Sequence, residues 1–235
     1  MKQIGIIGGL GPESTVEYYQ SIIKKYQKKE NSLQVLPELY INSINMYNIF
    51  KYISEERMDD LIEYLGNAAR KLELLDVDGI IIAANTPHLV FEEVQKQVEV
   101  PMLSIVDAAV EAAENQGAEN IGLLGTKFTM EQNFFKKPFI EKGKNIYVPD
   151  ESTQQYLHEK IVSELENGIV NPETKKEFER ITREMIEQHK LDTVILGCTE
   201  LPMILSEKDF SIPFLDTMQV HVDRIVDFMF EESKA

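Results

Sequence analysis

The 235-residue sequence contains a single cysteine, Cys198, and no tryptophan. One cysteine excludes an intrachain disulfide and every zinc site that needs several cysteines. The four histidines lie far apart, at positions 88, 158, 189 and 221, and none belongs to an HExxH-type pair. We therefore expect no metal site.

Positive charge is also scarce. The sequence has 24 Lys and Arg against 40 Asp and Glu, a net charge of −16. Such a chain repels phosphate backbones and anionic lipid surfaces, so we expect neither a nucleic-acid nor a membrane partner. No run approaches 18 unbroken apolar residues, and the first glycines come too early for the apolar core of a signal peptide. With 43% hydrophobic residues, the composition predicts a soluble cytoplasmic protein with a packed core.

Short β-branched runs alternate with longer stretches of helical spacing. The predicted strands are residues 3–8, 33–44, 79–85, 101–105, 121–125, 193–197 and 212–216. A turn and helix are predicted over 9–27, with further helices at 55–75, 88–98, 107–116, 129–143, 151–167, 172–190 and 218–232. This alternation is typical of an α/β fold in which a mainly parallel sheet is flanked by helices.

Three blocks of the sequence recur in the same order at nearly the same shift. The matched pairs are QIGIIGGL (3–10) with NIGLLGTK (120–127), DGIIIAANTPHLV (78–90) with DTVILGCTELPMI (192–204), and VPMLSIVDAAV (100–110) with IPFLDTMQVHV (212–222). This duplication predicts two similar lobes, related by a pseudo-twofold axis, with the active site in the cleft between them. The predicted lobes are residues 1–99 and 100–216, with a closing helix, 217–235, that packs back on the first.

The duplication makes four predicted strand ends equivalent in pairs. Ligands of parallel sheets bind beyond the carboxyl ends of the strands, where backbone N–H groups and helix N-termini favour anions. These ends therefore predict a site for the carboxylate of an amino acid or dicarboxylate. The predicted binding residues are Leu10, Gly11, Asn85, Thr86, Thr126, Thr129, Thr199 and Glu200.

A nucleotide is a weaker alternative for the glycine-rich turn. The stretch from Gly9 to Ser14 comes close to GxGxxG, but the third glycine is missing. Glu13 would also face a pyrophosphate with like charge. A tight turn that needs φ > 0 explains part of this glycine pattern in any case.

Cys198 is the candidate catalytic residue. A lone cysteine is more often a small buried hydrophobe, but this one follows a strand and a glycine and opens a turn into a predicted helix. Thiolates are stabilised at such positions, and Thr199 and Glu200 add polar neighbours. His88 and His221 are expected to be structural or hydrogen-bonding groups. The acidic stretches 55–60 and 164–187 are expected to be solvated helix faces.

Four ordered motifs resemble the signature blocks of the aspartate/glutamate racemase family. They are GGLGPEST (8–15), NTPH (85–88), LLGTKFTM (123–130) and GCTE (197–200). The resemblance implies two α/β lobes, a homodimer, and racemisation of a small acidic amino acid without a cofactor. In that family a cysteine from each lobe acts on opposite faces of Cα, one removing a proton while the other returns one.

The sequence departs from this pattern at Ala84, which stands where the resemblance places the first catalytic cysteine. The internal repeat independently aligns Ala84 with Cys198. Alanine cannot transfer a proton, so Cys198 remains as the thiol acid or base on one face of Cα. Two other functions stay open: a one-cysteine decarboxylase or isomerase of the same superfamily, and a catalytically weak protein that binds a dicarboxylate or amino acid.

Overall fold

A computed structural model describes residues 1–232. The chain forms two compact units, one made of Met1–Ile105 with the chain from His221 onward, the other of Val106–Val220. Each unit holds one four-stranded sheet, and every strand pairing in both sheets is parallel. The predicted α/β class, with two lobes built alike from parallel strands and helices, is confirmed.

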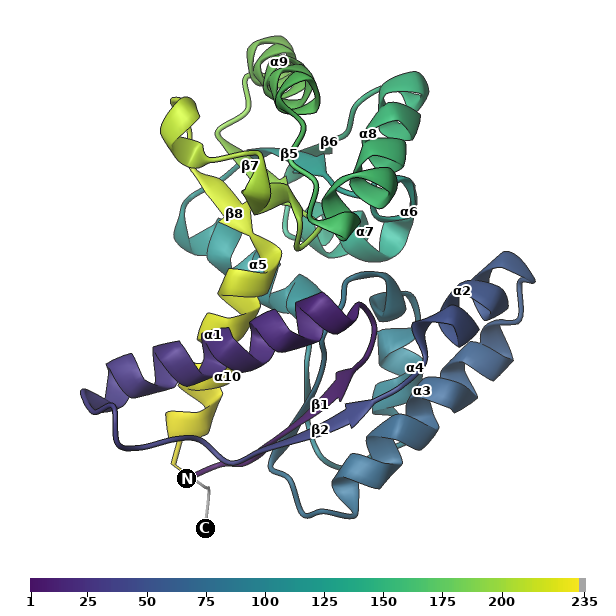
Figure 1. Cartoon of the computed structure of the whole chain (residues 1–235), viewed down its shortest axis with the longest axis vertical. Coiled ribbons are helices and arrows are strands. Elements are labelled where there is room, and N and C mark those ends of the chain that lie inside the picture. Colours follow the sequence, from purple (N-terminus) through teal and green to yellow (C-terminus); the bar gives the residue numbers. More distant parts are fainter. Residues whose placement is uncertain (233–235) are drawn as a thin grey trace. The chain divides into compact units, whose positions relative to one another are not determined.

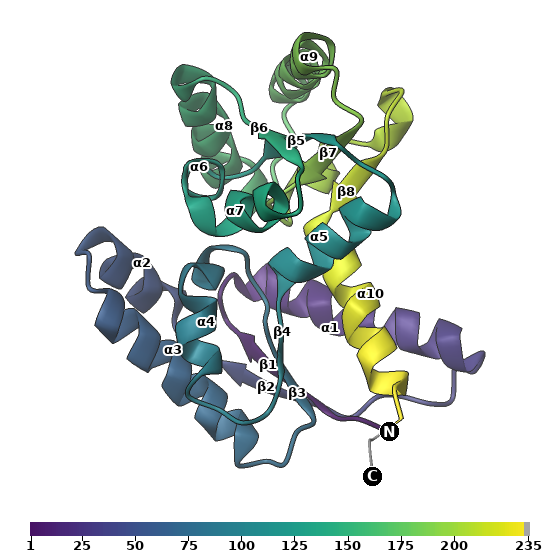
Figure 2. The same ribbon diagram turned by 180° about the vertical axis from the view of Figure 1, so that it is seen from behind.

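The first unit contains a sheet of order β2-β1-β3-β4 (Figures 1 and 2). Its elements are β1 (Ile4–Gly8), α1 (Pro12–Glu30), β2 (Leu39–Ser43), α2 (Met46–Ser54), α3 (Met58–Glu73), β3 (Gly79–Ile82), the 3₁₀ helix η1 (Thr86–Val90), α4 (Phe91–Gln95) and β4 (Met102–Leu103). Most of α10 (Thr217–Phe230) also belongs to this unit.

Alternate side chains of the central strands enter two different cores of this unit. Ile7, Ile80 and Ile82 pack with Leu65 and other residues of α3 and α4. Glycines let helices approach closely, because a Cβ on Gly5 would lie 3.1 Å from Leu72 and one on Gly79 would lie 2.8 Å from the Phe228 ring. The sheet is thus covered by α3 on one face and by α10 on the other, which explains why its strands are apolar throughout.

Helices α1 and α10 are joined by a buried polar contact and by ion pairs at the surface. The Tyr18 hydroxyl donates to Nδ1 of His221 over 2.9 Å, and Nε2–H of His221 donates to the Leu103 carbonyl over 2.9 Å. Both side chains are fully buried. Lys25 pairs with Asp223 and Lys29 with Asp227 along the same two helices.

The second unit repeats this topology, with strand order β6-β5-β7-β8. Its elements are α5 (Ile105–Asn115), β5 (Asn120–Leu124), α6 (Lys127–Glu131), α7 (Asn133–Glu141), β6 (Asn145–Tyr147), α8 (Glu151–Ser163), η2 (Leu165–Asn167), α9 (Pro172–His189), β7 (Thr193–Leu196), η3 (Leu201–Met203), η4 (Glu207–Asp209), β8 (Phe214–Asp216) and the start of α10. The repeated blocks fall on corresponding strands, so the sequence duplication is a duplication of topology.

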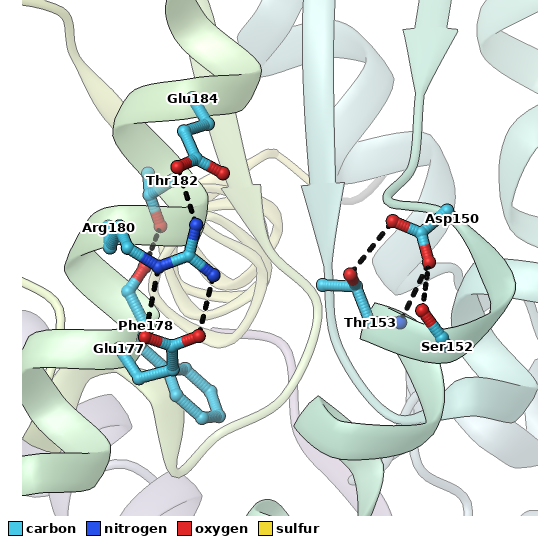
Figure 3. A network of polar contacts seen from close by, with 8 residues as sticks. All are labelled: Asp150, Ser152, Thr153, Glu177, Phe178, Arg180, Thr182 and Glu184. Atoms are coloured by element: carbon cyan, nitrogen blue, oxygen red, sulfur yellow. Dashed lines mark hydrogen bonds and ion pairs between the residues drawn. The ribbon is translucent and has the colours of Figure 1, made fainter.

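Local polar contacts fix the helices of this unit. The Asp150 carboxylate caps α8, accepting from the Thr153 N–H over 3.0 Å and from the hydroxyls of Ser152 and Thr153 (Figure 3). These hydrogen bonds, above all the one from Ser152, lower the pKa of Asp150 to about 2. On α9, Arg180 forms ion pairs with Glu177 and Glu184 (Figure 3). Within the acidic stretch 164–187, Glu173, Glu184 and Glu187 are exposed on α9, as predicted for a solvated helix face.

Several predicted boundaries were wrong. The strand predicted over 33–44 is shorter, because β2 begins only at Leu39, after Pro37, which has no N–H for a sheet. The helix predicted over 129–143 is broken at Gln132, whose ψ is 148°. Two elements were missed: α2, whose first turn is capped by the Asn45 side chain, and β6, only three residues long. The predicted closing helix ends at Phe230, and its proposed residues 233–235 lie outside the described part of the chain.

We predict that the stability of this protein falls between pH 7 and pH 5. Burial holds the pKa of His88 at about 4 and that of His221 at about 3, against 6.5 in the unfolded chain. The unfolded chain therefore binds more protons than the folded one in this range, and stability is lost as the pH falls below 6.5. Two such groups give a loss of ~4 kcal/mol in the free energy of unfolding between pH 7 and pH 5.

Urea unfolding at pH 7, 6 and 5 measures this loss. Lowered carboxylate pKa values act at more acidic pH, so the decline above pH 5 reports mainly on the histidines. A His221→Gln variant is expected to show about half of the decline. An unfolding free energy that stays constant from pH 7 to pH 5 would show that the buried histidines do not control it.

Candidate active site

The glycine-rich turn of the first unit is held by two hydroxyl side chains of α1. The Gly9 N–H donates to Oγ1 of Thr15 over 2.9 Å, and the Ser14 hydroxyl donates to the Ala83 carbonyl over 3.1 Å. Gly9 has φ 75°, and a Cβ there would lie 2.3 Å from the Ile44 carbonyl oxygen, so only glycine fits. Ser14 thereby ties the turn after β1 to the end of β3, and the two predicted strand ends of this unit are brought together.

His88 holds the segment that follows β3. Its Nδ1–H donates to the Ala84 carbonyl over 2.9 Å, while Nε2 accepts from the Ile105 N–H over 3.2 Å. The ring also stacks on Phe91, with centroids 5.1 Å apart. Because both nitrogens are engaged and burial lowers its pKa to about 4, His88 is a neutral structural group, as predicted. It sets the position of Ala84 and Asn85 at the strand end.

The second unit places the ends of β5 and β7 against each other. A Cβ on Gly125 would lie 3.2 Å from the Gly197 carbonyl oxygen, and one on Gly197 would lie 3.3 Å from Cγ2 of Thr129. Thr126 caps α6, since its Oγ1 accepts from the Thr129 N–H over 3.4 Å and lies 3.1 Å from the Thr129 hydroxyl. The predicted residues of this unit therefore lie on adjacent turns beside Cys198.

The Cys198 thiol makes a hydrogen bond with a carboxylate two residues further along the chain. Sγ donates to Oε2 of Glu200 over 2.8 Å. The pKa of the thiol is raised well above its ordinary value, first by burial of Sγ and then by the charge of Glu200, with a smaller contribution from Glu166. At neutral pH the cysteine is therefore a protonated thiol.

The predicted stabilisation of a thiolate is wrong for this structure. That prediction relied on a helix beginning after Cys198, but the chain forms only η3, a 3₁₀ helix of three residues. So short a helix has little dipole, and two neighbouring carboxylates outweigh it.

The predicted binding residues differ in their exposure. Asn85 and Thr129 are buried, at 8% and 1% exposure. The partly exposed residues of the prediction are Leu10, Gly11, Ala84, Thr86, Thr126, Cys198, Thr199 and Glu200. The latter group has atoms exposed to solvent, whereas Asn85 and Thr129 lie beneath the surface.

Three site features were not predicted from the sequence. The hydroxyls of Ser14 and Thr15 lock the glycine turn, although the sequence suggested only a helix start there. Tyr18 contacts His221 across 203 positions of sequence. Glu166 lies close enough to Glu200 for the two charges to raise the pKa of Glu166, after the larger effect of its own desolvation. No local pattern marks such long-range contacts.

Within residues 1–232, the structure contains no group of three or more His, Cys, Asp or Glu side chains arranged to hold a metal ion. Over the same residues, no helix is both long enough and apolar enough to cross a membrane.

Two parallel sheets of the same topology, with a thiol at one strand end, are the features that the four sequence motifs predicted for a racemase-like α/β protein. Comparison with known sequences tests this prediction. The sequence profile of the Asp/Glu/Hydantoin racemase family matches residues 7–225, nearly the whole chain. The chain belongs to this family, as its four motifs predicted.

Individual relatives span almost the full chain. It is 26% identical to the broad specificity amino-acid racemase RacX of Bacillus subtilis over 91% of this chain and 92% of that protein. A crystal structure of an aspartate racemase homologue from Pyrococcus horikoshii is 38% identical, with a TM-score of 0.88, and covers 98% of this chain and 100% of the other. A candidate Asp/Glu racemase from Yersinia pestis is 29% identical with a TM-score of 0.93, covering 98% and 100%.

We predict that Glu200→Gln makes Cys198 react faster with iodoacetamide at pH 7.5. Removing the adjacent negative charge lowers the pKa of the thiol and raises the thiolate fraction, which is the reactive form. We expect a rate increase of about ten-fold, for a pKa that falls by about one unit. Because the chain has one cysteine, the alkylation rate measured by mass spectrometry reports on Cys198 alone.

Glu187→Gln is the matched control, since Glu187 is exposed on α9 and its replacement changes the net charge equally. This control is expected to react at the parent rate. Equal alkylation rates for Glu200→Gln and the parent protein would mean that the charge of Glu200 does not raise the pKa of the Cys198 thiol.

Proposed function

We propose that this protein is a cofactor-independent amino-acid racemase in which Cys198 transfers a proton at Cα of the substrate. The observation that carries the proposal is the Sγ–Oε2 contact of 2.8 Å at the carboxyl end of β7, in a chain of a racemase family. The resemblance supports aspartate or glutamate as substrate, whereas the name of the Bacillus relative supports a wider range. The proposal is therefore made for amino acids as a class.

In the proposed mechanism, Cys198 and Glu200 work as a pair. The thiol first passes its proton to Glu200, which creates a thiolate and a neutral carboxylic acid without a change in total charge. The thiolate then removes the Cα proton, and the N–H groups of the strand-end turns stabilise the negative charge that develops on the substrate carboxylate. The new Sγ–H proton exchanges with water, and a solvent proton then returns from Sγ to Cα, which gives solvent exchange on one face of Cα.

Inversion also needs a proton donor for the other face, and Ala84 cannot be that donor. Ala84 and Cys198 follow corresponding strands, β3 and β7, of the two duplicated sheets. We therefore propose that Ala84 occupies the position of the family's first cysteine and that water donates the second proton. Inversion is then slower than exchange, because water is a much weaker acid than a thiol at this position.

The raised pKa of Cys198 also favours a second function, a decarboxylase that acts on a malonate-like substrate. Loss of CO₂ leaves a planar intermediate that needs one proton on one face, and a protonated thiol is suited to that task. The two functions differ in their products. Release of CO₂ from a malonate, dependent on Cys198 and without exchange of any amino acid, would replace the racemase proposal with the decarboxylase.

We predict that Cys198→Ser lowers Cα exchange by at least ~100-fold, the scale expected for a positioned acid–base group. Serine is nearly the same size but far less acidic, so folding and ligand binding are expected to stay close to those of the parent. Exchange is measured by NMR in D₂O with L- and D-amino acids, and folding by circular dichroism. Parent-like exchange in this variant would show that Cys198 is not the acid–base group, and tight binding without exchange in the parent would indicate a binding protein.

We predict that Ala84→Cys increases the rate of inversion of both enantiomers, by roughly 10- to 100-fold, because it supplies a second positioned acid–base group. Chiral chromatography measures inversion, and NMR measures exchange in the same samples. Ala84→Ser serves as the matched variant of similar size without an acidic group. An Ala84→Cys protein with unchanged inversion would contradict the assignment of residue 84 to the first-cysteine position.

A further inference from the structure

The chain connects its two units at two places, and both lie in helices. It passes from the first unit to the second between Ile105 and Val106, at the start of α5. It returns between Val220 and His221, one turn into α10. On the side of the first unit the connections therefore end at Ile105 and His221, and the contacts of these two residues decide how that unit holds them.

Two buried histidines of the first unit hold both connections. Nε2 of His88 accepts from the Ile105 N–H over 3.2 Å, immediately before the first connection. His221, immediately after the second connection, donates from Nε2–H to the Leu103 carbonyl over 2.9 Å. The two rings lie edge to face with their centroids 6.4 Å apart, and both side chains are buried. Both connections thus meet at His88 and His221, which are called the histidine pair below.

Every ring nitrogen of the histidine pair is in a hydrogen bond. Nδ1–H of His88 donates to the Ala84 carbonyl over 2.9 Å, and Nδ1 of His221 accepts from the Tyr18 hydroxyl over 2.9 Å. Burial lowers the pKa of His88 to about 4 and that of His221 to about 3, so each ring keeps one donor and one acceptor nitrogen at neutral pH. Because an imidazole ring is rigid, His88 holds the Ala84 carbonyl at a set separation from the Ile105 N–H.

The internal duplication indicates that this topology does not require the histidine pair. The repeated blocks align His88 with Pro202 and His221 with Ala109. The second unit therefore builds the same sheet without either ring, and Ala109 is fully buried there. Buried polar groups cost free energy unless they are hydrogen-bonded, a cost that an apolar side chain avoids. The geometry that the histidine pair specifies thus explains its presence better than packing does.

We propose that the histidine pair couples the strand end at Ala84 to both connections between the units, and that His88 and His221 are positioning residues for the reaction. This inference rests on the proposed function, because Ala84 and its neighbour Asn85 belong to the proposed site. A displacement of the chain at Ile105 is transmitted to Ala84 through one rigid ring. A misplacement of ~1 Å can lower a catalytic rate ~100-fold, so losing one hydrogen bond of the pair is expected to lower turnover.

Two variants of His88 separate its two hydrogen bonds. His88→Gln can still accept from the Ile105 N–H but loses the bond to Ala84, whereas His88→Asn can still donate to Ala84 but loses the bond to Ile105. Both are expected to lower kcat for Cα exchange about ten-fold and to leave KM within about two-fold, because positioning acts on the transition state. Thr182→Val is the matched control. It removes another buried hydrogen bond, to the Phe178 carbonyl on α9, and is expected to keep the parent kcat.

Hydrogen exchange of the Ile105 amide, followed by NMR, tests the coupling without turnover. Its rate is expected to rise about ten-fold in His88→Asn, which removes the acceptor, and about three-fold in Tyr18→Phe, which loosens the neighbouring His221 ring. It is expected to match the parent in His88→Gln and Thr182→Val. Tyr18→Phe removes one hydroxyl and keeps both histidines, so it decides the question even if the His88 variants fold poorly.

The outcomes separate this inference from the proposed function. A parent protein without Cα exchange would overturn the proposed function, and the Ile105 amide would still decide whether the two rings are coupled. A parent-like kcat in His88→Asn, in a protein that circular dichroism shows to be folded, would mean that the Ala84 bond alone positions the strand end and would contradict the role of the connections. Parent-like exchange of the Ile105 amide in Tyr18→Phe would overturn the coupling itself.

Discussion

The parallel pairing of two buried strands at the centre of each sheet is the constraint on which the rest of this protein depends. All residues of β1, β3 and β7 are buried, and so are four of the five in β5. Because helices cover both faces, these strands carry only apolar side chains, glycine and single small polar residues at their ends. Polar chemistry is thereby confined to the turns at the carboxyl ends, which is where Cys198 and the glycine turn lie.

Packing of these turns depends on small residues and on hydroxyl groups. Gly125 and Gly197 allow the ends of β5 and β7 to approach to contact distance, and Ser14 bridges the ends of β1 and β3. His88 donates a hydrogen bond from Nδ1–H to the Ala84 carbonyl at the end of β3. These contacts fix the backbone of the strand-end turns, and under the proposed function they would prearrange N–H groups for the negative charge that develops on a substrate.

The electrostatics of Cys198 follow from the same architecture. The thiol is desolvated by burial, and the charges of Glu200 and Glu166 act on it. Both effects disfavour the thiolate, so the proton rests on Sγ in the free protein. Two of the carboxylates that contribute to the net charge of −16 thus act directly on the pKa of the Cys198 thiol.

The sequence by itself determined the α/β class, the duplicated topology and the position of the only thiol at a strand end. Local periodicity and the repeat of blocks such as QIGIIGGL and NIGLLGTK predict these features. Both signals can be read without any knowledge of tertiary contacts. Sequence-based prediction failed at β6, which is only three residues long, and at α2, a nine-residue helix that follows closely on β2. Tertiary structure alone decided that Tyr18 meets His221 and that the charge of Glu200 acts on Glu166. It also decided the protonation of Cys198, because a pKa depends on burial and on charges that the folded chain brings together from distant positions.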